Sequence, residues 1–373
     1  MSMQSSVLER YSEGAEQRQE ALCCPVDYDP ALLKMLPQEI IDKDYGCGDP
    51  SRYVQAGDTV LDLGSGGGKI CYMAAQLVGD EGLVIGIDMN DDMLDLARRH
   101  QAAMAAKIGG DRVRFLKGQI QDLAINLEAM DSWLAEHPVH TSRDLAALHT
   151  FERQQKLKAP LIENASIDLI ISNCVLNLVD AHQKEGMFSD MFRVLKPGGR
   201  VAISDIVSDE VVSAELMADP ELWSGCISGA MEESALIEAF AAAGFTGIRI
   251  DKWESAPWQI VGDIEFRSVT ITAVKPISCC LRDQGHAVVY RGPFPEAIDD
   301  NGNRYLRGHR IAVSAQCFKR LMQPPYADAF IGITPAQPQI EEPWNHPAGT
   351  LRPSSSSKRA AHQGEVGKTG GCC

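Results

Sequence analysis

The stretch VLDLGSGGGKICYMAAQ, residues 60–76, combines a β-strand pattern, a glycine-rich turn and a helix pattern in direct succession. The glycines between residues 64 and 68 let the main chain turn tightly and approach a ligand closely. The next apolar run, LVIGIDM (83–89), places Asp88 at its end, twenty residues after Gly68. A carboxylate at that position can accept hydrogen bonds from ribose hydroxyls. The stretch therefore predicts a ribose-containing ligand at a strand–turn–helix unit.

Strand and helix patterns alternate on both sides of this stretch. Such alternation predicts parallel βαβ units and an α/β, Rossmann-like fold. The segments that alternate are TVLDLG (59–64), KICYMAAQLV (69–78), LVIGIDM (83–89), DDMLDLARRHQAAMAAKIG (91–109) and VRFLKG (113–118), and the rhythm resumes at 167 with IDLIISN and runs to EFRSVTITAVKP (265–276).

The glycines alone leave NAD and S-adenosylmethionine open as ligands, and three features favour the second. The dinucleotide fingerprint requires glycine at its sixth position, which is Lys69 when counted from Gly64. Asp62 precedes Gly64 by two residues, where a carboxylate can hold a charged amino-acid group. LKPGGRVAISD (195–205) follows a helix pattern and opens a strand. Together these motifs resemble the class I S-adenosylmethionine-dependent methyltransferases.

That resemblance implies a seven-stranded sheet whose last hairpin is reversed, formed here by GIRID (247–251) and EFRSVTITAV (265–274). It also implies a set of cofactor-binding positions along the first four strands. Gln121 departs from the acidic residue that is usual in the family, and Asn173 is expected near the methionine end. The implied cofactor-binding residues are Asp62, Gly64, Ser65, Gly66, Asp88, Met89, Ile120, Gln121 and Asn173.

Charge and composition exclude several classes of partner. The chain has 35 Lys and Arg against 51 Asp and Glu, a net charge of −16 that repels nucleic acids and anionic membranes. No apolar run approaches the roughly 18 residues of a membrane span. The first twenty residues are polar and lack the apolar core of a secretory signal. We therefore expect a cytoplasmic protein with no nucleic-acid or membrane partner.

The chain is expected to divide into four parts. Residues 1–55 mix helix and loop patterns, and residues 56–276 form the cofactor-binding domain, with a helical insertion at 124–160. Short strands and a helix predict a small α+β domain at 277–334. Residues 335–373 are rich in Pro, Ser and Gly, a composition that predicts disorder. The insertion could cap the active site, form an interface or be a solvated decoration.

Cysteine usage is the most unusual feature of the chain. Eleven cysteines, an odd number without any CxxC pair, fit neither a disulfide framework nor a zinc ribbon. Cys71 lies in a helix pattern and is best explained as a small buried hydrophobe. Cys174 ends the strand IDLIISN, at the sheet edge where ligands of α/β proteins bind. Cys47 and Cys226 lie beside glycines, in DYGCG and SGCISG.

DYGCG, SNCVLNLV, LWSGCISGA and a terminal GGCC together resemble the arsenite S-adenosylmethionine methyltransferases, over the whole chain. The resemblance implies that trivalent arsenic, as arsenite or methylarsenite, binds to the thiolates of Cys47, Cys174 and Cys226. It implies a fourth cysteine for disulfide exchange, Cys24 or Cys23. It also implies S-adenosylmethionine as methyl donor, glutathione or a thioredoxin-like protein as reductant, and a role in arsenic detoxification.

Two other functions are compatible with the sequence. One is a methyltransferase for an organic small molecule, for which the three cysteines would lie far apart. The other is a non-catalytic metalloid-binding protein. The arsenite interpretation instead predicts that Cys47, Cys174 and Cys226 converge above the cofactor site, where two of them can form a disulfide when no arsenic is bound.

Overall fold

The computed structural model describes residues 3–16, 26–43, 45–277, 281–336 and 342–357. The chain divides into two compact units, Met1–Pro276 and Ile277–Cys373. The first unit contains the glycine-rich stretch and all of the strands predicted around it. In the described residues, no helix is both long enough and apolar enough to cross a membrane.

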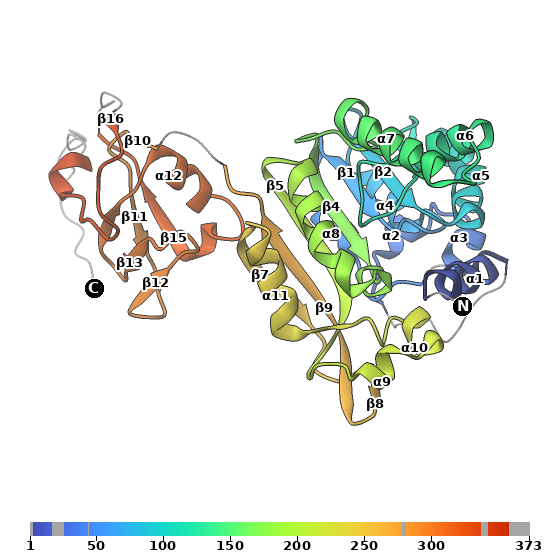
Figure 1. Ribbon diagram of the computed structural model, residues 1–373. Coiled ribbons are helices and arrows are strands. Elements are labelled where there is room, and N and C mark those ends of the chain that lie inside the picture. Colours follow the sequence, from blue (N-terminus) through green and yellow to red (C-terminus); the bar gives the residue numbers. More distant parts are fainter. Residues whose placement is uncertain (1–2, 17–25, 44, 278–280, 337–341, 358–373) are drawn as a thin grey trace. The chain divides into compact units, whose positions relative to one another are not determined.

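The first unit is built on a mixed sheet with the strand order β3-β2-β1-β4-β5-β9-β7 (Figure 1). The neighbours from β3 to β5 are parallel, whereas β9 is antiparallel to both β5 and β7. This is the class I methyltransferase sheet, and the expected reversed hairpin is confirmed. The strands are β1 (Thr59–Leu63), β2 (Leu83–Asp88), β3 (Val113–Lys117), β4 (Ile167–Asn173), β5 (Leu195–Ser208), β7 (Thr246–Trp253) and β9 (Ile264–Val274), with β6 (Met231–Glu232) beside β5 and β8 (Gln259–Val261) beside β9.

Helices cover both faces of this sheet because the central strands are apolar on both sides. In β4, Ile170 joins one buried cluster while Leu169 and Ile171 join the other, as the alternation of side chains along a strand requires. The first cluster includes residues of α8 (Ala181–Val194) and α11 (Glu233–Ala242). The second includes residues of α4 (Lys69–Leu77) and α5 (Asp91–Ile108).

The insertion between β3 and β4 forms two helices, α6 (Leu127–Glu136) and α7 (Ser142–Lys158). Asn126 caps the first helix, and Thr141 forms a capping box with Asp144 at the start of the second. The Trp133 ring stacks on Phe151, which joins the two helices to each other. Among their residues only Gln155 is buried, so the pair lies on the surface of the unit.

The N-terminal segment packs on the same unit. It comprises α1 (Met3–Glu16), α2 (Pro30–Leu33), α3 (Gln38–Asp42) and the 3-10 helix η2 (Pro50–Tyr53). Helix α1 contacts both α5 and the short helix α10 (Pro220–Ser224), which follows α9 (Ala214–Met217) (Figure 1). It therefore joins two segments that are distant from it in the sequence.

The second unit is a small α+β fold. Its central strand β11 (Ala287–Tyr290) pairs with β14 (Arg310–Ala312) and β15 (Phe330–Ile333), and α12 (Ala315–Leu321) lies between those two in sequence. Val288, Ile311 and Leu321 are among its buried residues. Two further strand pairs are β12 (Glu296–Ile298) with β13 (Arg304–Leu306), and β10 (Arg282–Asp283) with β16 (Glu342–Pro343).

Part of the segment expected to be disordered belongs to this second unit. Within residues 342–357, Arg352 donates a hydrogen bond of 2.7 Å to Asp283, and the ring of His346 lies 2.7 Å from the same carboxylate. Leu351 forms an isolated antiparallel β-bridge with Ile311. Composition favoured disorder here because the segment has few apolar residues. The partly buried carboxylate of Asp283 nevertheless gives Arg352 and His346 a specific hydrogen-bond partner. The Cys279–Cys280 and Cys372–Cys373 pairs lie outside the described residues.

Candidate active site

A cavity of about 550 Å³ lies at the carboxyl ends of β1, β2 and β4 in the first unit. This is the edge of an open α/β sheet at which ligands bind. No residue of the 124–160 insertion is among those that line it, so the insertion does not cap the cavity in this structure. All of the cofactor positions inferred from the sequence line the cavity: Asp62, Gly64, Ser65, Gly66, Asp88, Met89, Ile120, Gln121 and Asn173.

The glycine-rich turn brings its main chain to the cavity wall. Gly64 and Gly66 have φ angles of +70° and +49°, a left-handed region that side chains rarely adopt. A Cβ atom on Gly64 would lie 2.5 Å from the Val175 side chain, so this position also has no space for one. At Gly66 a Cβ would meet nothing within 4 Å, which shows that the main chain there borders open space.

Asp88, at the end of β2, accepts a hydrogen bond from the main chain of this glycine-rich turn. One carboxylate oxygen accepts a hydrogen bond of 2.8 Å from Gly66 N, and the other accepts one of 2.9 Å from Asn90 N. Burial raises the pKa of Asp88, and these main-chain hydrogen bonds oppose the rise. Each carboxylate oxygen can accept a second hydrogen bond, so Asp88 keeps capacity for ribose hydroxyls.

These residues fit the adenosyl group that the fold implies. The main chain at Gly66 borders open space, and Asp88 keeps spare acceptors beside it. Ser65 also lines the cavity. An open main chain next to free carboxylate lone pairs indicates a polar ligand in this position.

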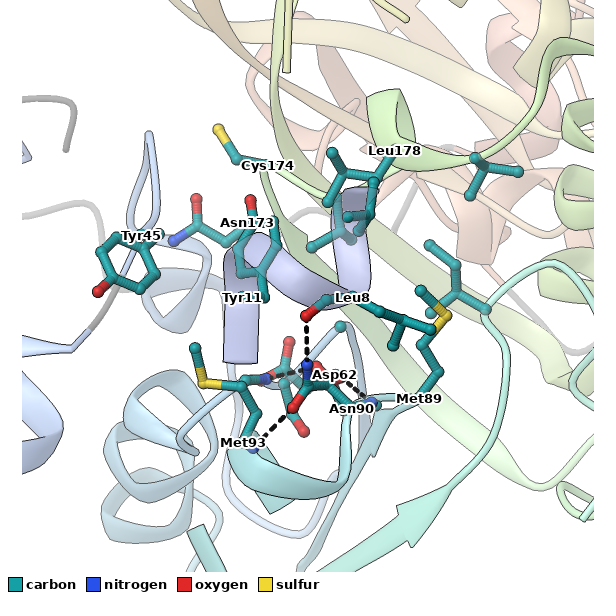
Figure 2. A pocket seen from close by; sticks show the side chains of 18 of the residues that line it. Leu8, Tyr11, Tyr45, Asp62, Met89, Asn90, Met93, Asn173, Cys174 and Leu178 are labelled. Atoms are coloured by element: carbon teal, nitrogen blue, oxygen red, sulfur yellow. Dashed lines mark hydrogen bonds between the residues drawn. The ribbon is translucent and has the colours of Figure 1, made fainter. Parts of the chain in front are cut away.

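The N-terminal helix α1 also lines the cavity, although no sequence motif predicted it there. Leu8 and Tyr11 face it (Figure 2), and Asn90 Nδ2 donates hydrogen bonds of 3.2 Å to Leu8 O and 3.0 Å to Ser12 Oγ. Tyr45 Oη donates one of 3.0 Å to Gly14 O. Leu8 and Tyr11 lie about one helical turn apart in an otherwise polar segment. This spacing was the sequence signal that could have predicted a helix packed over the cavity.

The three cysteines inferred as arsenic ligands lie in one buried cluster. Cys47 and Cys174 are joined as a disulfide with a Cα–Cα distance of 5.9 Å, across a sequence separation of 127 residues. Cys226 Sγ lies 3.2 Å from Cys174 O, across 52 residues. All three side chains are at most 5% exposed, and Cys174 also lines the cavity. The organic-acceptor alternative expected these cysteines to lie far apart, and they do not.

Cys174 and Cys226 both adopt left-handed main-chain conformations, with φ angles of 59° and 63°. Residues other than glycine rarely do so, and such strain is typical of functional sites. Among the described residues, no group of three His, Cys, Asp or Glu side chains is placed to hold a metal ion. Two of the three cysteine sulfurs are joined in this state. Three free thiols therefore require reduction of the Cys47–Cys174 bond.

Charged and polar groups surround Cys226. Burial raises the pKa of Asp205 above its usual range and lowers the pKa of Lys184 below its usual range. The Lys184 ammonium donates a hydrogen bond of 2.5 Å to Gly229 O, in the loop that carries Cys226. Tyr11 Oη lies 3.9 Å from Cys226 Sγ, and burial raises the pKa of Tyr11. The thiol thus lies among buried polar groups rather than in a purely apolar core.

Four further residues were singled out in the sequence: Cys23, Cys24, Cys71 and Asn173. Cys23 and Cys24 lie outside the described residues. Cys71 is fully buried, as expected, and its thiol donates a 3.2 Å hydrogen bond to Asp62. Asn173 lines the cavity, but its amide is hydrogen-bonded to the loop that contains Cys47.

Comparisons with known proteins identify the family and the fold of the chain. A family profile described as a methyltransferase domain matches residues 55–157 and 143–244, and one described as a domain of unknown function, DUF8838, matches residues 278–362. The crystal structure of an arsenic(III) S-adenosylmethionine methyltransferase from Chlamydomonas reinhardtii is 28% identical. Its match covers 86% of this chain and 100% of that chain, with a TM-score of 0.56.

Two curated relatives extend the similarity beyond the sheet. The arsenite methyltransferase of Rattus norvegicus is 29% identical over 93% of this chain and 88% of its own length. That of Aquipseudomonas alcaligenes is 32% identical over 83% of each protein. Identity at this level over most of both chains indicates common descent as well as a shared fold, and the chain belongs to the arsenite methyltransferase family of class I S-adenosylmethionine-dependent methyltransferases.

Proposed function

We propose that this enzyme methylates trivalent arsenic held by the thiolates of Cys47, Cys174 and Cys226. The observation that carries the proposal is the convergence of these three cysteines, from three distant segments, in one buried cluster beside the glycine-loop cavity. The relatives named above are described as arsenite or arsenic(III) methyltransferases, and their similarity covers 83–93% of this chain. The product class would be methylarsenicals, and the biological role arsenic detoxification.

The cavity residues would hold S-adenosylmethionine, which supplies an electrophilic methyl group when it is bound. Asp88 would accept hydrogen bonds from the ribose, and Met89, Ile120 and Gln121 would flank the adenine. Asp62 would face the amino-acid end, since it lies buried at the end of β1. Helix α1 would exclude water from the covered cavity.

The thiolates supply the acceptor chemistry. Trivalent arsenic is soft and binds thiolates in preference to oxygen ligands. Each thiol that replaces an arsenic-bound hydroxide transfers its proton to that hydroxide, which leaves as water. The arsenic keeps its lone pair, so no general base is needed to create a nucleophile. Fixing the arsenic beside the methyl donor would provide much of the rate enhancement through proximity and alignment.

A redox step completes the cycle. When the arsenic lone pair forms the new arsenic–carbon bond, arsenic is formally oxidised by two electrons. Two cysteine thiolates can return both electrons by joining as a disulfide, for which the Cys47–Cys174 bond is one candidate. Cys24 or Cys23 would exchange with that disulfide. Glutathione or a thioredoxin-like dithiol would then restore the thiols, and the reaction would take place in the reducing cytoplasm.

The test is to incubate the full-length protein with methyl-labelled S-adenosylmethionine, arsenite and a thiol, and to separate labelled arsenicals by chromatography. We expect labelled methylarsenicals from the wild-type protein. Cys174→Ser and Cys226→Ser should form none while still binding S-adenosylmethionine, because a serine hydroxyl is a hard ligand that stays protonated. Cys317→Ser, in the second unit, is the matched control and should retain activity. Absence of labelled arsenicals from the wild-type protein would contradict the proposal.

A further inference from the structure

Two buried asparagines flank Cys174 in the segment SNCVLN (172–177). Asn173 and Asn177 are 9% and 2% exposed. Buried amides of this kind must find hydrogen-bond partners, and the partners they find fix the segments that carry them. The partners of these two side chains lie in the two other cysteine loops.

Asn173 binds the loop that carries Cys47. Its Oδ1 accepts hydrogen bonds of 2.9 Å from Cys47 N and 3.0 Å from Gly48 N, and its Nδ2 donates one of 2.8 Å to Gly48 O. Because main-chain N–H groups face one end of the amide and a carbonyl faces the other, the orientation of the amide is fixed. Figure 2 shows Asn173 beside Cys174 at the cavity.

The glycines of the DYGCG motif permit this contact. A Cβ on Gly46 would lie 2.1 Å from Asn173 Nδ2, and a Cβ on Gly48 would lie 2.3 Å from Ser204 Oγ. Ser268 Oγ donates a further hydrogen bond of 2.8 Å to Cys47 O. The main chain of the Cys47 loop therefore packs directly against Asn173. A glycine on each side of Cys47 makes this close approach possible.

Asn177 binds the loop that carries Cys226. Its Nδ2 donates hydrogen bonds of 2.7 Å to Ile206 O and 3.3 Å to Cys226 O. A Cβ on Gly229, in the same loop, would lie 1.8 Å from Asn177 O, so this loop also approaches the segment through a glycine. One amide thus contacts the Cys47 loop, and the other contacts the Cys226 loop.

We propose that Asn173 and Asn177 are positioning residues that align Cys47 and Cys226, respectively, with Cys174. The purpose of that alignment, a three-thiolate arsenic site, rests on the proposed function. The alignment itself is a property of the protein without arsenic and is tested separately. A merely structural role would lower overall stability in both variants alike, whereas separate positioning roles predict that each variant disturbs one cysteine.

The first measurement is the reduction potential of the Cys47–Cys174 disulfide, by equilibration of the full chain with dithiothreitol buffers and mass spectrometry of trapped peptides. Asn173→Ala should lower the equilibrium constant for disulfide formation about ten- to a hundredfold. At about 30 mV per tenfold change, the potential becomes about 30–60 mV less negative. Asn177→Ala should leave the potential unchanged.

The second measurement is the alkylation rate of Cys226 by iodoacetamide in the oxidised protein, read from the same peptides. Asn177→Ala should raise this rate about tenfold, and Asn173→Ala should not change it, so each variant is the control for the other. Equal effects of both variants in either measurement, or no effect of either variant, would overturn the proposal.

The isosteric variant Asn173→Asp covers the case in which Asn173→Ala does not fold. The new carboxylate would keep the acceptor for Cys47 N and Gly48 N, but its second oxygen would face Gly48 O and repel it where the amide donated a hydrogen bond. A shift in the same direction is therefore expected, and an unchanged potential would also contradict the proposal. Failure to detect methylarsenicals would disprove the proposed function without altering these outcomes.

Discussion

Single residues set the chemistry of the cofactor end of the site. Asp88 accepts main-chain hydrogen bonds from Gly66 and Asn90, so it holds the glycine turn against the end of β2. Its remaining lone pairs border the cavity. Asp62, by contrast, is 2% exposed and accepts a hydrogen bond from the Cys71 thiol. Two carboxylates on neighbouring strands thus have different surroundings, and Asp88 has the acceptors that suit a ribose.

We expect Asp88→Ala to weaken S-adenosylmethionine binding by about 1–3 kcal/mol, the range for hydrogen bonds to a charged group and for unpaired buried partners. Isothermal titration calorimetry measures the change directly. Asp91→Ala is the matched control, because its side chain is 69% exposed and pairs with Lys117 outside the cavity. Unchanged affinity in Asp88→Ala would assign ribose recognition to another residue.

At the scale of elements, helix α1 connects the two ends of the active site. It is hydrogen-bonded to Asn90 beside the glycine turn, and its Arg10 donates hydrogen bonds of 2.9 Å to Glu221 O and Ser224 Oγ in α10. Helix α10 ends two residues before Cys226. Closure over the cavity and the position of the Cys226 loop therefore depend on the same helix.

Deletion of residues 1–16 should accelerate release of S-adenosylmethionine at least tenfold, because the helix that covers the cavity is lost. Stopped-flow displacement of the bound ligand measures this rate. The surface helix pair α6–α7 offers a control deletion: Leu161 N lies 3.1 Å from Ala124 O, so a short linker can replace residues 127–158. Equal release rates in the wild-type protein and the 1–16 deletion would show that α1 is not a cover.

At the scale of the whole molecule, the second unit is stabilised by a segment from the region expected to be disordered. Arg352 and His346 both contact Asp283, whose side chain is 14% exposed. Burial opposes ionisation of Asp283, but hydrogen bonds from Arg352, Gly285 N and His346 lower its pKa to about 2. The ionised carboxylate therefore joins residues 342–357 to the strands of the unit.

This ion cluster predicts a loss of stability in acid. A carboxyl group with a depressed pKa in the folded state contributes fully above its unfolded pKa, near 4, and the contribution disappears as pH falls through about 2. We expect a loss of roughly 1–2 kcal/mol for this unit between pH 5 and pH 2. Urea unfolding across this range should show the loss in the wild-type protein and a smaller one in Asp283→Asn, and identical pH profiles would contradict the assignment.

Truncations separate this structural segment from the rest of the tail. A chain ending at Ser357 lacks Cys372–Cys373 but keeps Arg352, and we expect it to support the first methyl transfer with saturating arsenite and dithiothreitol. A chain ending at Pro335 also loses Arg352 and His346, so its second unit should unfold at a lower temperature. Single-turnover assays and calorimetric melting test the two expectations. Loss of turnover in the longer chain, the one ending at Ser357, would assign the terminal cysteines a role in that step.

The sequence by itself predicted the sheet and the glycine turn with Asp88, because local patterns encode both, whereas the other cofactor positions followed only from resemblance to a family. Period-two and helical patterns fix the strands and helices, and residues 60–76 place the glycine turn beside Asp88 within one βαβ unit. Cys47, Cys174 and Cys226 could be selected only through resemblance to a family. Cys47 and Cys174 are separated by 127 positions in the sequence, and Cys174 and Cys226 by 52. No local periodicity relates residues at such separations.

Only the tertiary structure decided which groups meet. It places α1 over the cavity, attaches residues 342–357 to Asp283, and brings the amides of Asn173 and Asn177 to two distant loops. These contacts depend on long-range folding, which buries a hydrogen-bond donor away from solvent and brings an acceptor close to it. Such pairings carry no sequence signature, because an asparagine or an arginine can satisfy its hydrogen bonds with any main-chain or carboxylate group that packing brings near.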